Sequence, residues 1–465
     1  MADQPMTLHL ARYATSARFD DLSGEVREAL KIRLLDALGC AIGALDGPPI
    51  AILRQDLAEF GGAPLVSLVG GGRAAPRDAA LYNGALVRYL DFNDSYIAPG
   101  ETCHPSDNVG AVLAAAEYRD LPGSELLTAL AVAYQVQCRL ADEGPVRARN
   151  FDHVTHAGYA ATSGVARALR LEPEQAAHAL SMAGTALNAL RVTRTSLSHW
   201  KGLAYPYAAA EAVHLALLAA RGLTGPLGAL DGRKGLMDAI SGPFALDWES
   251  ESFDRIPRTF VKRFNAEVHS QPALEALLEL RAEHGLRPED VEAVELDTFD
   301  VAYDIIGGGS DGEKTTITTK EEADHSLPYL LAVALLDGQV LPAQYAPERV
   351  VAADVQDLLT RVTIRNRPEY TRRFPDELAC KVRVRTRGGA VLEREKSDYA
   401  GHWRRPADRD SALAKFTGLT ERAVGAELRE ELVSCVLSLE ERPTSALTDL
   451  LRRVPGDAKA DERGA

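Results

Sequence analysis

Acidic, imidazole and thiol side chains gather in one short stretch, residues 91–108, whose sequence is DFNDSYIAPGETCHPSDN. The stretch follows LYNGALVRYL, a run in which apolar residues recur at helical spacing, and its Pro99 and Gly100 favour a loop. Three explanations are open at this point. The cluster could bind a metal ion, form a solvated loop, or move protons, and the choice depends on the partners that the rest of the chain supplies.

His104 and Asp91 are the main candidates for proton transfer in this stretch. A helix is predicted to begin near Pro105, so His104 lies at its start, where the helix dipole favours a bound anion and a neutral imidazole. His104 could instead only cap or pack. Asp91 is interpreted as an orienting group or proton carrier, and Asp94 as a loop residue. A magnesium site would need a second acidic motif, which the sequence does not offer, so we predict no metal and no other cofactor.

Four further segments also bring polar side chains to the start of a predicted helix. For each segment alone, a solvated charge or a buried structural histidine is the commoner outcome. An H-x-x-H pair without a carboxylate partner is weak evidence for a metal. The segments are FDHVTHAG with His153 and His156, SLSHWKGLAYP with His199 and Lys201, FVKRFNAEVHSQPAL with Lys262, Arg263, Glu267 and His269, and ADHSLPYLL with His325 and Tyr329.

Taken together, these junctions predict a pocket for a polyanion. Helix N-termini expose backbone N–H groups and carry positive potential, so several of them converging would attract negative charge. A cation about 4 Å from a carboxylate contributes about 4 kcal/mol before desolvation at an effective dielectric of about 20. Two or three such contacts would hold a dicarboxylate or tricarboxylate, even in an acidic protein.

The composition limits the possible partners. The net charge of −15 argues against nucleic acid and anionic membranes, because both need a basic surface, but it allows a small anionic substrate. The five cysteines are an odd number without a C-x-x-C pair, which favours a cytoplasmic protein without a disulfide framework. No secretory leader and no apolar run of about 18 residues is found.

The apolar spacing predicts mainly helical structure with a smaller α+β part. Helices rich in small residues are expected in the first half, with Ser23 and Ser124 as N-caps and Pro76 in a first turn. Strand alternation appears near residues 291–299, 359–367 and 380–398, the last as a hairpin turning at Gly388-Gly389. The predicted organisation is a helical domain at 5–255, a smaller α/β domain at 256–404, C-terminal helices at 405–455 that return to the helical domain, and a frayed tail at 456–465.

The polar motifs, in their order along the chain, resemble the MmgE/PrpD family. The segments that carry the resemblance are LDFNDSYIAPGETCHPSDNVGAVLAAAE, FDHVTHAGYAA, SHWKGLAYP, VKRFNAEVHSQPALEA and ADHSLPYLLAVALLDG, followed by HWRRP. The segments DFND…HPSDN, FDHV and AEVHSQ are more narrowly similar to the branch of 2-methylcitrate dehydratases. The resemblance implies a large helical domain built from both chain ends, a smaller α/β domain, a homodimer, and catalysis without an iron–sulfur cluster.

The resemblance also implies a set of site residues. Ser95 stands where related decarboxylases have Thr, and Glu267 where they have His. Asn265 stands where the family usually has Pro, a departure that would alter the approach of the loop bearing Lys262. Mapped by motif, the implied catalytic residues are His104, Asp91, Tyr329 and Lys201, and the implied substrate-binding residues are Ser95, His153, Lys262, Glu267 and His269.

The implied activity is dehydration of 2-methylcitrate, a tricarboxylate. In this hypothesis His104 and Asp91 form the proton-transfer pair, and Tyr329 positions or donates. Lys201, Lys262 and His153 bind carboxylates. Two alternatives stay open: a lyase that decarboxylates cis-aconitate, and a non-catalytic helical protein that binds tricarboxylates.

Overall fold

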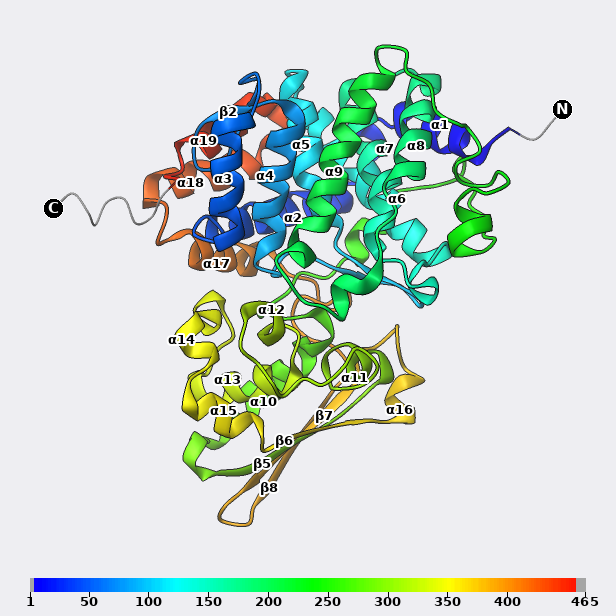
Figure 1. The fold of residues 1–465 in the computed structure, drawn as a ribbon. Coiled ribbons are helices and arrows are strands. Elements are labelled where there is room, and N and C mark those ends of the chain that lie inside the picture. Colours follow the sequence, from blue (N-terminus) through cyan, green and yellow to red (C-terminus); the bar gives the residue numbers. More distant parts are fainter. Residues whose placement is uncertain (1–3, 457–465) are drawn as a thin grey trace. The chain divides into compact units, whose positions relative to one another are not determined.

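The computed structural model describes residues 4–456, and the chain divides into two compact units. Unit 1 comprises residues 1–191, 202–259 and 408–465, and unit 2 comprises residues 192–201 and 260–407. Figure 1 shows the fold, with the C-terminal helices lying beside helices from the N-terminal half in unit 1. Apart from Gly456, the predicted frayed tail lies outside the described residues.

Unit 1 is helical apart from two short antiparallel ribbons, β1 (Val66–Ser67) with β2 (Arg73–Ala74) and β3 (Tyr96–Ile97) with β4 (Thr102–Cys103). Helix α9 starts in the segment grouped with unit 2 and continues in unit 1 from residue 202. The helices are α1 (Met6–Ser16), α2 (Gly24–Gly43), α3 (Pro48–Phe60), α4 (Pro76–Tyr89), α5 (Val109–Tyr118), α6 (Gly123–Glu143), α7 (Ala157–Leu169), α8 (Pro173–Ala186), α9 (Trp200–Ala219), α17 (Arg409–Thr420), α18 (Ala426–Leu437) and α19 (Thr444–Arg453).

Small residues let these helices approach closely. A Cβ at Gly110 of α5 would lie 2.5 Å from the backbone nitrogen of Gly84 in α4, so α5 needs glycine at this crossing. A Cβ at Gly39 of α2 would lie 3.1 Å from the ring of Phe416 in α17. The α4–α5 crossing fixes the helices that precede Asp91 and follow His104.

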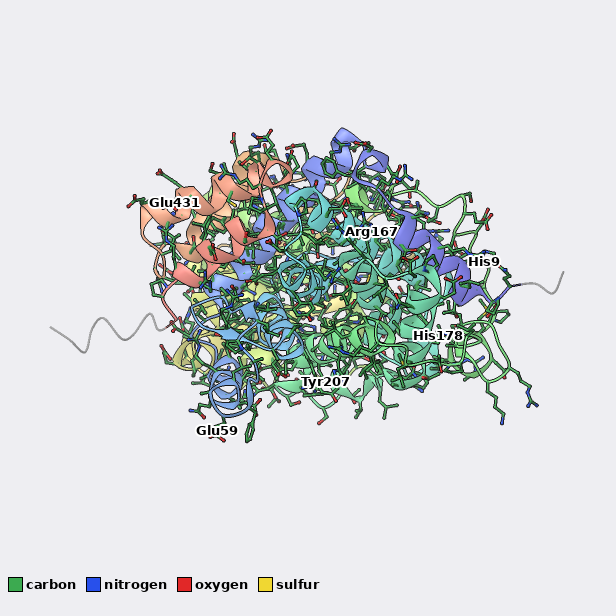
Figure 2. All side chains as sticks on the ribbon, turned by 90° about the horizontal axis from the view of Figure 1, so that it is seen from above. His9, Glu59, Arg167, His178, Tyr207 and Glu431 are labelled. Carbon is green, nitrogen blue, oxygen red and sulfur yellow. The ribbon has the colours of Figure 1, made fainter. Side chains whose placement is uncertain are left out.

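Buried polar side chains tie unit 1 together further. The Arg167 guanidinium of α7 donates to the Ala17 carbonyl oxygen, just past the end of α1, at 2.8 Å. Figure 2 shows Arg167 among packed helices, whereas Glu59 on α3 lies at the rim.

Of the three residues predicted as N-caps or first-turn residues, Ser23 and Pro76 are confirmed. The Ser23 hydroxyl accepts from the Val26 amide at 3.2 Å, and Pro76 is the first residue of α4. The prediction for Ser124 is wrong, because Pro122 is the N-cap of α6 and Ser124 lies inside the helix. The Gly123 amide donates to the Arg442 carbonyl oxygen at 2.7 Å, so packing against the C-terminal segment determines where this helix begins.

Unit 2 contains a four-stranded sheet in the order β6-β5-β7-β8. The pair β5–β6 is parallel and the other pairs are antiparallel. The predicted hairpin at Gly388-Gly389 is confirmed, with Gly389 at φ +85°, a conformation that glycine adopts readily. The strands are β5 (Val291–Thr298), β6 (Val362–Asn366), β7 (Cys380–Thr386) and β8 (Val391–Lys396).

Helices α10 and α13 pack with this sheet around the hydrophobic core of unit 2. The alternating burial along β7 matches the strand period of its sequence. The helices are α10 (Gln271–His284), α11 (Asp300–Ile306), α12 (Lys320–Ala323), α13 (Leu327–Asp337), α14 (Pro347–Val350), α15 (Ala353–Leu359) and α16 (Pro368–Thr371). The predicted fold class, mainly α with a smaller α+β part, is confirmed.

Within residues 4–456, no single helix has the length and apolar character needed to cross a membrane. Helices α2 and α3 meet that criterion only when taken as a pair, and a bend of 84° separates them.

Candidate active site

Asp91 directly follows the end of helix α4 and has a left-handed backbone conformation. Its φ is +55°, and its amide donates to the Arg88 carbonyl oxygen at 3.0 Å. Glycine commonly occupies this position after a helix. Here an aspartate does, and its carboxylate lies 2.8 Å from Nη1 of Arg88, with both side chains buried. The helix end therefore presents a fixed carboxylate–guanidinium pair.

A buried hydrogen-bond network joins the loop after Asp91 to the segment after His104. The Asn93 amide nitrogen donates to Ser106 Oγ at 2.9 Å and to Asp107 Oδ1 at 2.8 Å. Asp94 Oδ1 accepts from the Ser106 amide at 2.9 Å. Asp94 is therefore an internal bridge of the site, which corrects its interpretation as a simple loop residue.

His104 is held in one tautomer by this loop. The ribbon β3–β4 pairs Tyr96 with Cys103, which brings the preceding Ser95 next to His104. His104 Nδ1 lies 2.9 Å from the Asp94 carbonyl oxygen and 3.0 Å from Ser95 Oγ. A carbonyl oxygen can only accept, so Nδ1 carries the hydrogen, and in the neutral ring the lone pair is on Nε2. This arrangement suits a general base.

His153 lies beside His104 in unit 1. The ring centroids are 5.6 Å apart in an edge-to-face arrangement. His153 Nδ1 lies 2.8 Å from Asp152 Oδ1, which orients the ring. The ring of His153 also stacks on the ring of Tyr205. The Tyr205 hydroxyl donates to Asn108 Oδ1 at 2.9 Å.

His156 has a structural position. It is fully buried, its Nε2 lies 3.0 Å from the Gly144 carbonyl oxygen, and burial lowers its pKa to about 4. His153 and His156 share an H-x-x-H spacing but contact different partners: His153 lies beside His104, whereas His156 bonds the backbone at Gly144.

Burial changes the protonation of the acids around His104. It raises the pKa of Asp107 to about 7, because desolvation outweighs Arg88 and Asn93, and Asp94 and Asp91 add repulsion. Burial also raises the pKa of Asp94. Desolvation, together with the Asp152 charge, raises the pKa of Glu101 to about 7. The site in unit 1 therefore contains carboxyl groups that exchange protons near neutral pH.

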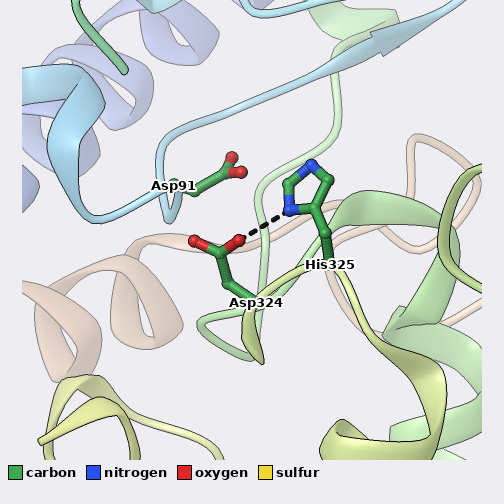
Figure 3. A group of neighbouring side chains, drawn as sticks. All are labelled: Asp91, Asp324 and His325. Atoms are coloured by element: carbon green, nitrogen blue, oxygen red, sulfur yellow. Dashed lines mark hydrogen bonds and ion pairs between the residues drawn. The ribbon is translucent and has the colours of Figure 1, made fainter. Parts of the chain in front are cut away.

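In unit 2 a second cluster forms around the buried carboxylate of Asp324. His325 Nδ1 lies 2.6 Å from Asp324 Oδ1, the contact drawn in Figure 3; Asp91, also drawn there, belongs to unit 1. Lys201 Nζ lies 3.1 Å from the same oxygen and 2.8 Å from His325 Nδ1. Lys320 Nζ contacts Asp324 Oδ2 at 2.7 Å. Although burial opposes it, these positive partners keep the pKa of Asp324 well below its usual range.

Glu267 and His269 form a close pair in unit 2. Glu267 accepts from His269 Nδ1 at 2.6 Å and from the His269 amide at 2.7 Å. Burial tends to raise the pKa of Glu267, but His269, His325 and Lys262 lower it overall. The His269 side chain is enclosed and contacts the rings of Phe299 and Phe374. Its fixed position therefore orients the Glu267 carboxylate.

Asn265, where the family resemblance leads one to expect proline, uses its backbone N–H. The Asn265 amide donates to the Val340 carbonyl oxygen at 2.9 Å, a bond that proline could not form. The Asn265 carbonyl oxygen accepts from the Tyr345 hydroxyl. These two hydrogen bonds anchor the loop that carries Lys262. Lys262 is fully buried, and its charge helps to lower the pKa of Glu267.

Tyr329, one of the predicted catalytic residues, is anchored inside unit 2 by its hydroxyl. The residue is fully buried in the core of unit 2, and its hydroxyl donates to the Gln344 carbonyl oxygen. Burial raises the pKa of this hydroxyl. The catalytic role stays a prediction, while the observed contact is structural.

The structure groups the predicted residues in two sets. Unit 1 brings Asp91, Ser95, His104 and His153 onto one connected framework, and unit 2 does the same for Lys201, Lys262, Glu267 and His269. Sequence reasoning missed Arg88 and Asp324 as partners. The i, i+3 spacing of Arg88 and Asp91 is a signal that could have indicated that pair, and Asp324 directly precedes His325.

These features define a mainly helical protein of two units that carries oriented imidazole, carboxyl and ammonium groups suited to acid–base chemistry. Comparison with known proteins identifies the family. The model of the MmgE/PrpD N-terminal domain matches residues 8–249, and that of the MmgE/PrpD C-terminal domain matches residues 264–441. The chain belongs to the MmgE/PrpD family.

Relatives resemble the chain over nearly its whole length. A protein of Cupriavidus necator named 2-methylcitrate dehydratase is 29% identical, covering 93% of this chain and 94% of its own. The 2-methylcitrate dehydratase of Escherichia coli K12 is 28% identical, over 90% and 91% of the two chains. The 2-methylcitrate dehydratase-like protein oryR of Aspergillus oryzae is 31% identical, over 89% and 88%.

Proposed function

We propose that this protein is a hydro-lyase that dehydrates 2-methylcitrate to 2-methyl-cis-aconitate in propionate breakdown. The near full-length similarity to 2-methylcitrate dehydratases of bacteria and a yeast carries the proposal. The oriented acid–base groups in unit 1 support it. Glu267, where related decarboxylases have His, favours dehydration over decarboxylation.

The reaction requires two proton transfers. A base removes the proton from the carbon that bears the methyl group and a carboxylate, a double bond forms, and the neighbouring hydroxyl leaves as water after it receives a proton. The neutral imidazole of His104 is the proposed base, because its lone pair lies on Nε2 while the Asp94 carbonyl oxygen holds Nδ1–H. Asp91 is the proposed partner in proton transfer, and its contact with Arg88 fixes its carboxylate.

Carboxylate binding is assigned to the residues that the family resemblance implies. His153 is the proposed ligand in unit 1, where Asp152 orients it. In unit 2 we assign Lys201 and Lys262, each of which acts near a buried acid. Ser95 supplies a hydroxyl beside His104. Each of these ligands would stabilise the charge that builds on a substrate carboxylate as the proton leaves.

The biological setting is also part of the proposal. We infer a cytoplasmic homodimer that acts on a small tricarboxylate, with no nucleic-acid partner, because the family resemblance implies a dimer and the net charge of −15 disfavours polyanionic macromolecules. Size-exclusion chromatography with light scattering would test the dimer.

The activity is tested by incubating the purified protein with 2-methylcitrate, citrate and cis-aconitate and identifying the products by mass. Loss of one water and a new conjugated double bond are expected from 2-methylcitrate. Release of carbon dioxide from cis-aconitate would show a decarboxylase instead, and a thermal shift without turnover would show a binding protein. Activity that survives exhaustive chelation would exclude an essential metal ion.

His104 is tested by His104→Gln. The turnover number should fall by at least about 10²-fold, because a positioned acid–base group typically contributes 10²- to 10⁴-fold. His214→Gln is the matched control, since His214 is an exposed residue of α9. Near-normal turnover in folded His104→Gln would remove His104 from the mechanism.

A further inference from the structure

A partly buried lysine from the C-terminal helices contacts the loop that carries Asp91. Lys415 lies on α17, which packs against α2 in unit 1. Its Nζ lies 2.6 Å from Asp36 Oδ1 and donates to the Phe92 carbonyl oxygen at 2.7 Å. The ammonium also lies 3.8 Å from the centroid of the Phe92 ring. One cation therefore joins α17, α2 and the residue that follows Asp91.

The ammonium group of Lys415 is held in place by its partners. The side chain of Lys415 is 10% exposed and that of Asp36 is fully enclosed. A buried ammonium needs a compensating charge and acceptors for its hydrogens, and Asp36 supplies the charge. The carbonyl oxygen and the π face of Phe92 supply the other contacts. Lys415 therefore binds the backbone of the loop as well as Asp36 of α2.

The backbone of the loop at Asp91 has a conformation that must be held by its surroundings. Asp91 has a φ of +55°, a conformation that costs a non-glycine residue free energy and persists only when its surroundings hold it. Two residues beyond Phe92, the Asp94 carbonyl oxygen accepts from Nδ1 of His104. A displacement of the Phe92 carbonyl would therefore move both Asp91 and the acceptor that orients the imidazole.

We propose that Lys415 is a positioning residue for the acid–base site of unit 1. It holds residues 91–95 in the conformation that fixes the Asp91 carboxylate and the tautomer of His104. Its kinetic consequence rests on the proposed function, whereas its effect on the loop does not. The competing explanation is that Lys415 only joins α17 to α2 and stabilises the fold.

The variants are chosen to separate these two roles. Lys415→Met alone would leave the Asp36 carboxylate buried without this cation and could unfold unit 1. The double variant Lys415→Met/Asp36→Asn removes the cation and the buried charge together. Asp36→Asn alone keeps Lys415 on the Phe92 carbonyl, and Lys415→Arg keeps a cationic donor. Arg409→Met is the matched control, since it breaks the exposed 2.9 Å pair of Arg409 with Glu28, which joins the same two helices.

Two measurements are made on the full-length protein. The first is kcat and KM with 2-methylcitrate. The double variant should lose at least ~10-fold in kcat with KM changed by less than ~3-fold, because misplacement of reacting groups affects the chemical step more than carboxylate binding. Asp36→Asn and Arg409→Met should stay within ~3-fold of the unchanged protein, and Lys415→Arg should recover most of the loss.

The second measurement is hydrogen–deuterium exchange of peptides covering residues 91–108. Exchange should be faster in the double variant and unchanged in Arg409→Met. Unchanged exchange and unchanged kcat in the double variant would overturn the proposal, as would an equal loss in Arg409→Met. If the unchanged protein does not turn over 2-methylcitrate, the proposed function fails, but the exchange experiment still decides whether Lys415 positions the loop.

Discussion

Replacing Asp107 by Asn should change how the stability of the protein depends on pH. Burial raises the pKa of Asp107 from its ordinary 3.8 to about 7, so the folded protein holds a proton there that the unfolded chain releases. For a carboxyl with a raised pKa, the contribution to stability is complete below the unfolded pKa and is lost as pH rises through the folded pKa. Unfolding should therefore become easier between about pH 4 and pH 7.

The magnitude follows from the two pKa values. The difference between 3.8 and about 7 corresponds to a loss of about 4 kcal/mol from this group once it is ionised in both states. About 1.6 kcal/mol of that is already lost at pH 5, so roughly 2.5 kcal/mol separates pH 5 from pH 8. Asp107→Asn keeps an acceptor for Asn93 and cannot ionise, so the variant lacks this loss.

The assay is urea unfolding of Asp107→Asn and the unchanged protein at pH 5 and pH 8. The variant should gain about 2.5 kcal/mol relative to the unchanged protein between the two pH values. Groups such as Glu101 titrate in both proteins and cancel in the comparison. Glu59→Gln, at an exposed position of α3, removes the same charge and should show no such gain (Figure 2). Parallel pH profiles for Asp107→Asn and the unchanged protein would refute the reasoning.

Two further variants probe other buried groups. Burial lowers the pKa of His156 from 6.5 to about 4, so about 3 kcal/mol of stability should be lost as pH falls through this range, and His156→Gln should flatten that loss in urea unfolding at pH 7 and pH 4.5. Tyr329→Phe removes the hydroxyl that donates to the Gln344 carbonyl oxygen, so it should lower the unfolding free energy by about 1–2 kcal/mol and leave kcat within ~3-fold. A loss of kcat of ~100-fold without loss of stability would instead support the predicted catalytic role of Tyr329.

Local sequence signals predicted the elements well, because those signals act over a few residues. The Ser23 cap, the first-turn Pro76 and the Gly388-Gly389 hairpin each depend on the conformation of adjacent residues, and all three are confirmed. Ser124 was misassigned because the start of α6 is fixed by Gly123 packing against backbone from the C-terminal segment, which propensity does not encode.

The sequence predicted those site residues that lie within a single motif. His104 and Ser95 lie nine residues apart and meet through a short ribbon, so a single segment contains both. Lys415 and Phe92 lie 323 residues apart, and Lys201 and Asp324 lie 123 residues apart. No spacing rule links residues so distant, and in the sequence Lys415 and Asp324 look like ordinary surface charges. The missed residues are therefore those that hold the motif residues in place.

The buried charges near loop 91–95 also explain why Asp107 should exchange its proton near neutral pH. Burial disfavours each ionised carboxyl, and nearby cations and hydrogen-bond donors offset that cost. Two acids have direct cationic contacts, Asp36 with Lys415 and Asp91 with Arg88, whereas the distance from Asp107 to Arg88 is 3.6 Å. Arg88 is thus shared, and Asp107, the more distant of its two acids, has its pKa raised to about 7. An ionised Asp107 would compete with Asp91 for the Arg88 guanidinium, so protonation of Asp107 favours the Arg88–Asp91 pair at the end of α4.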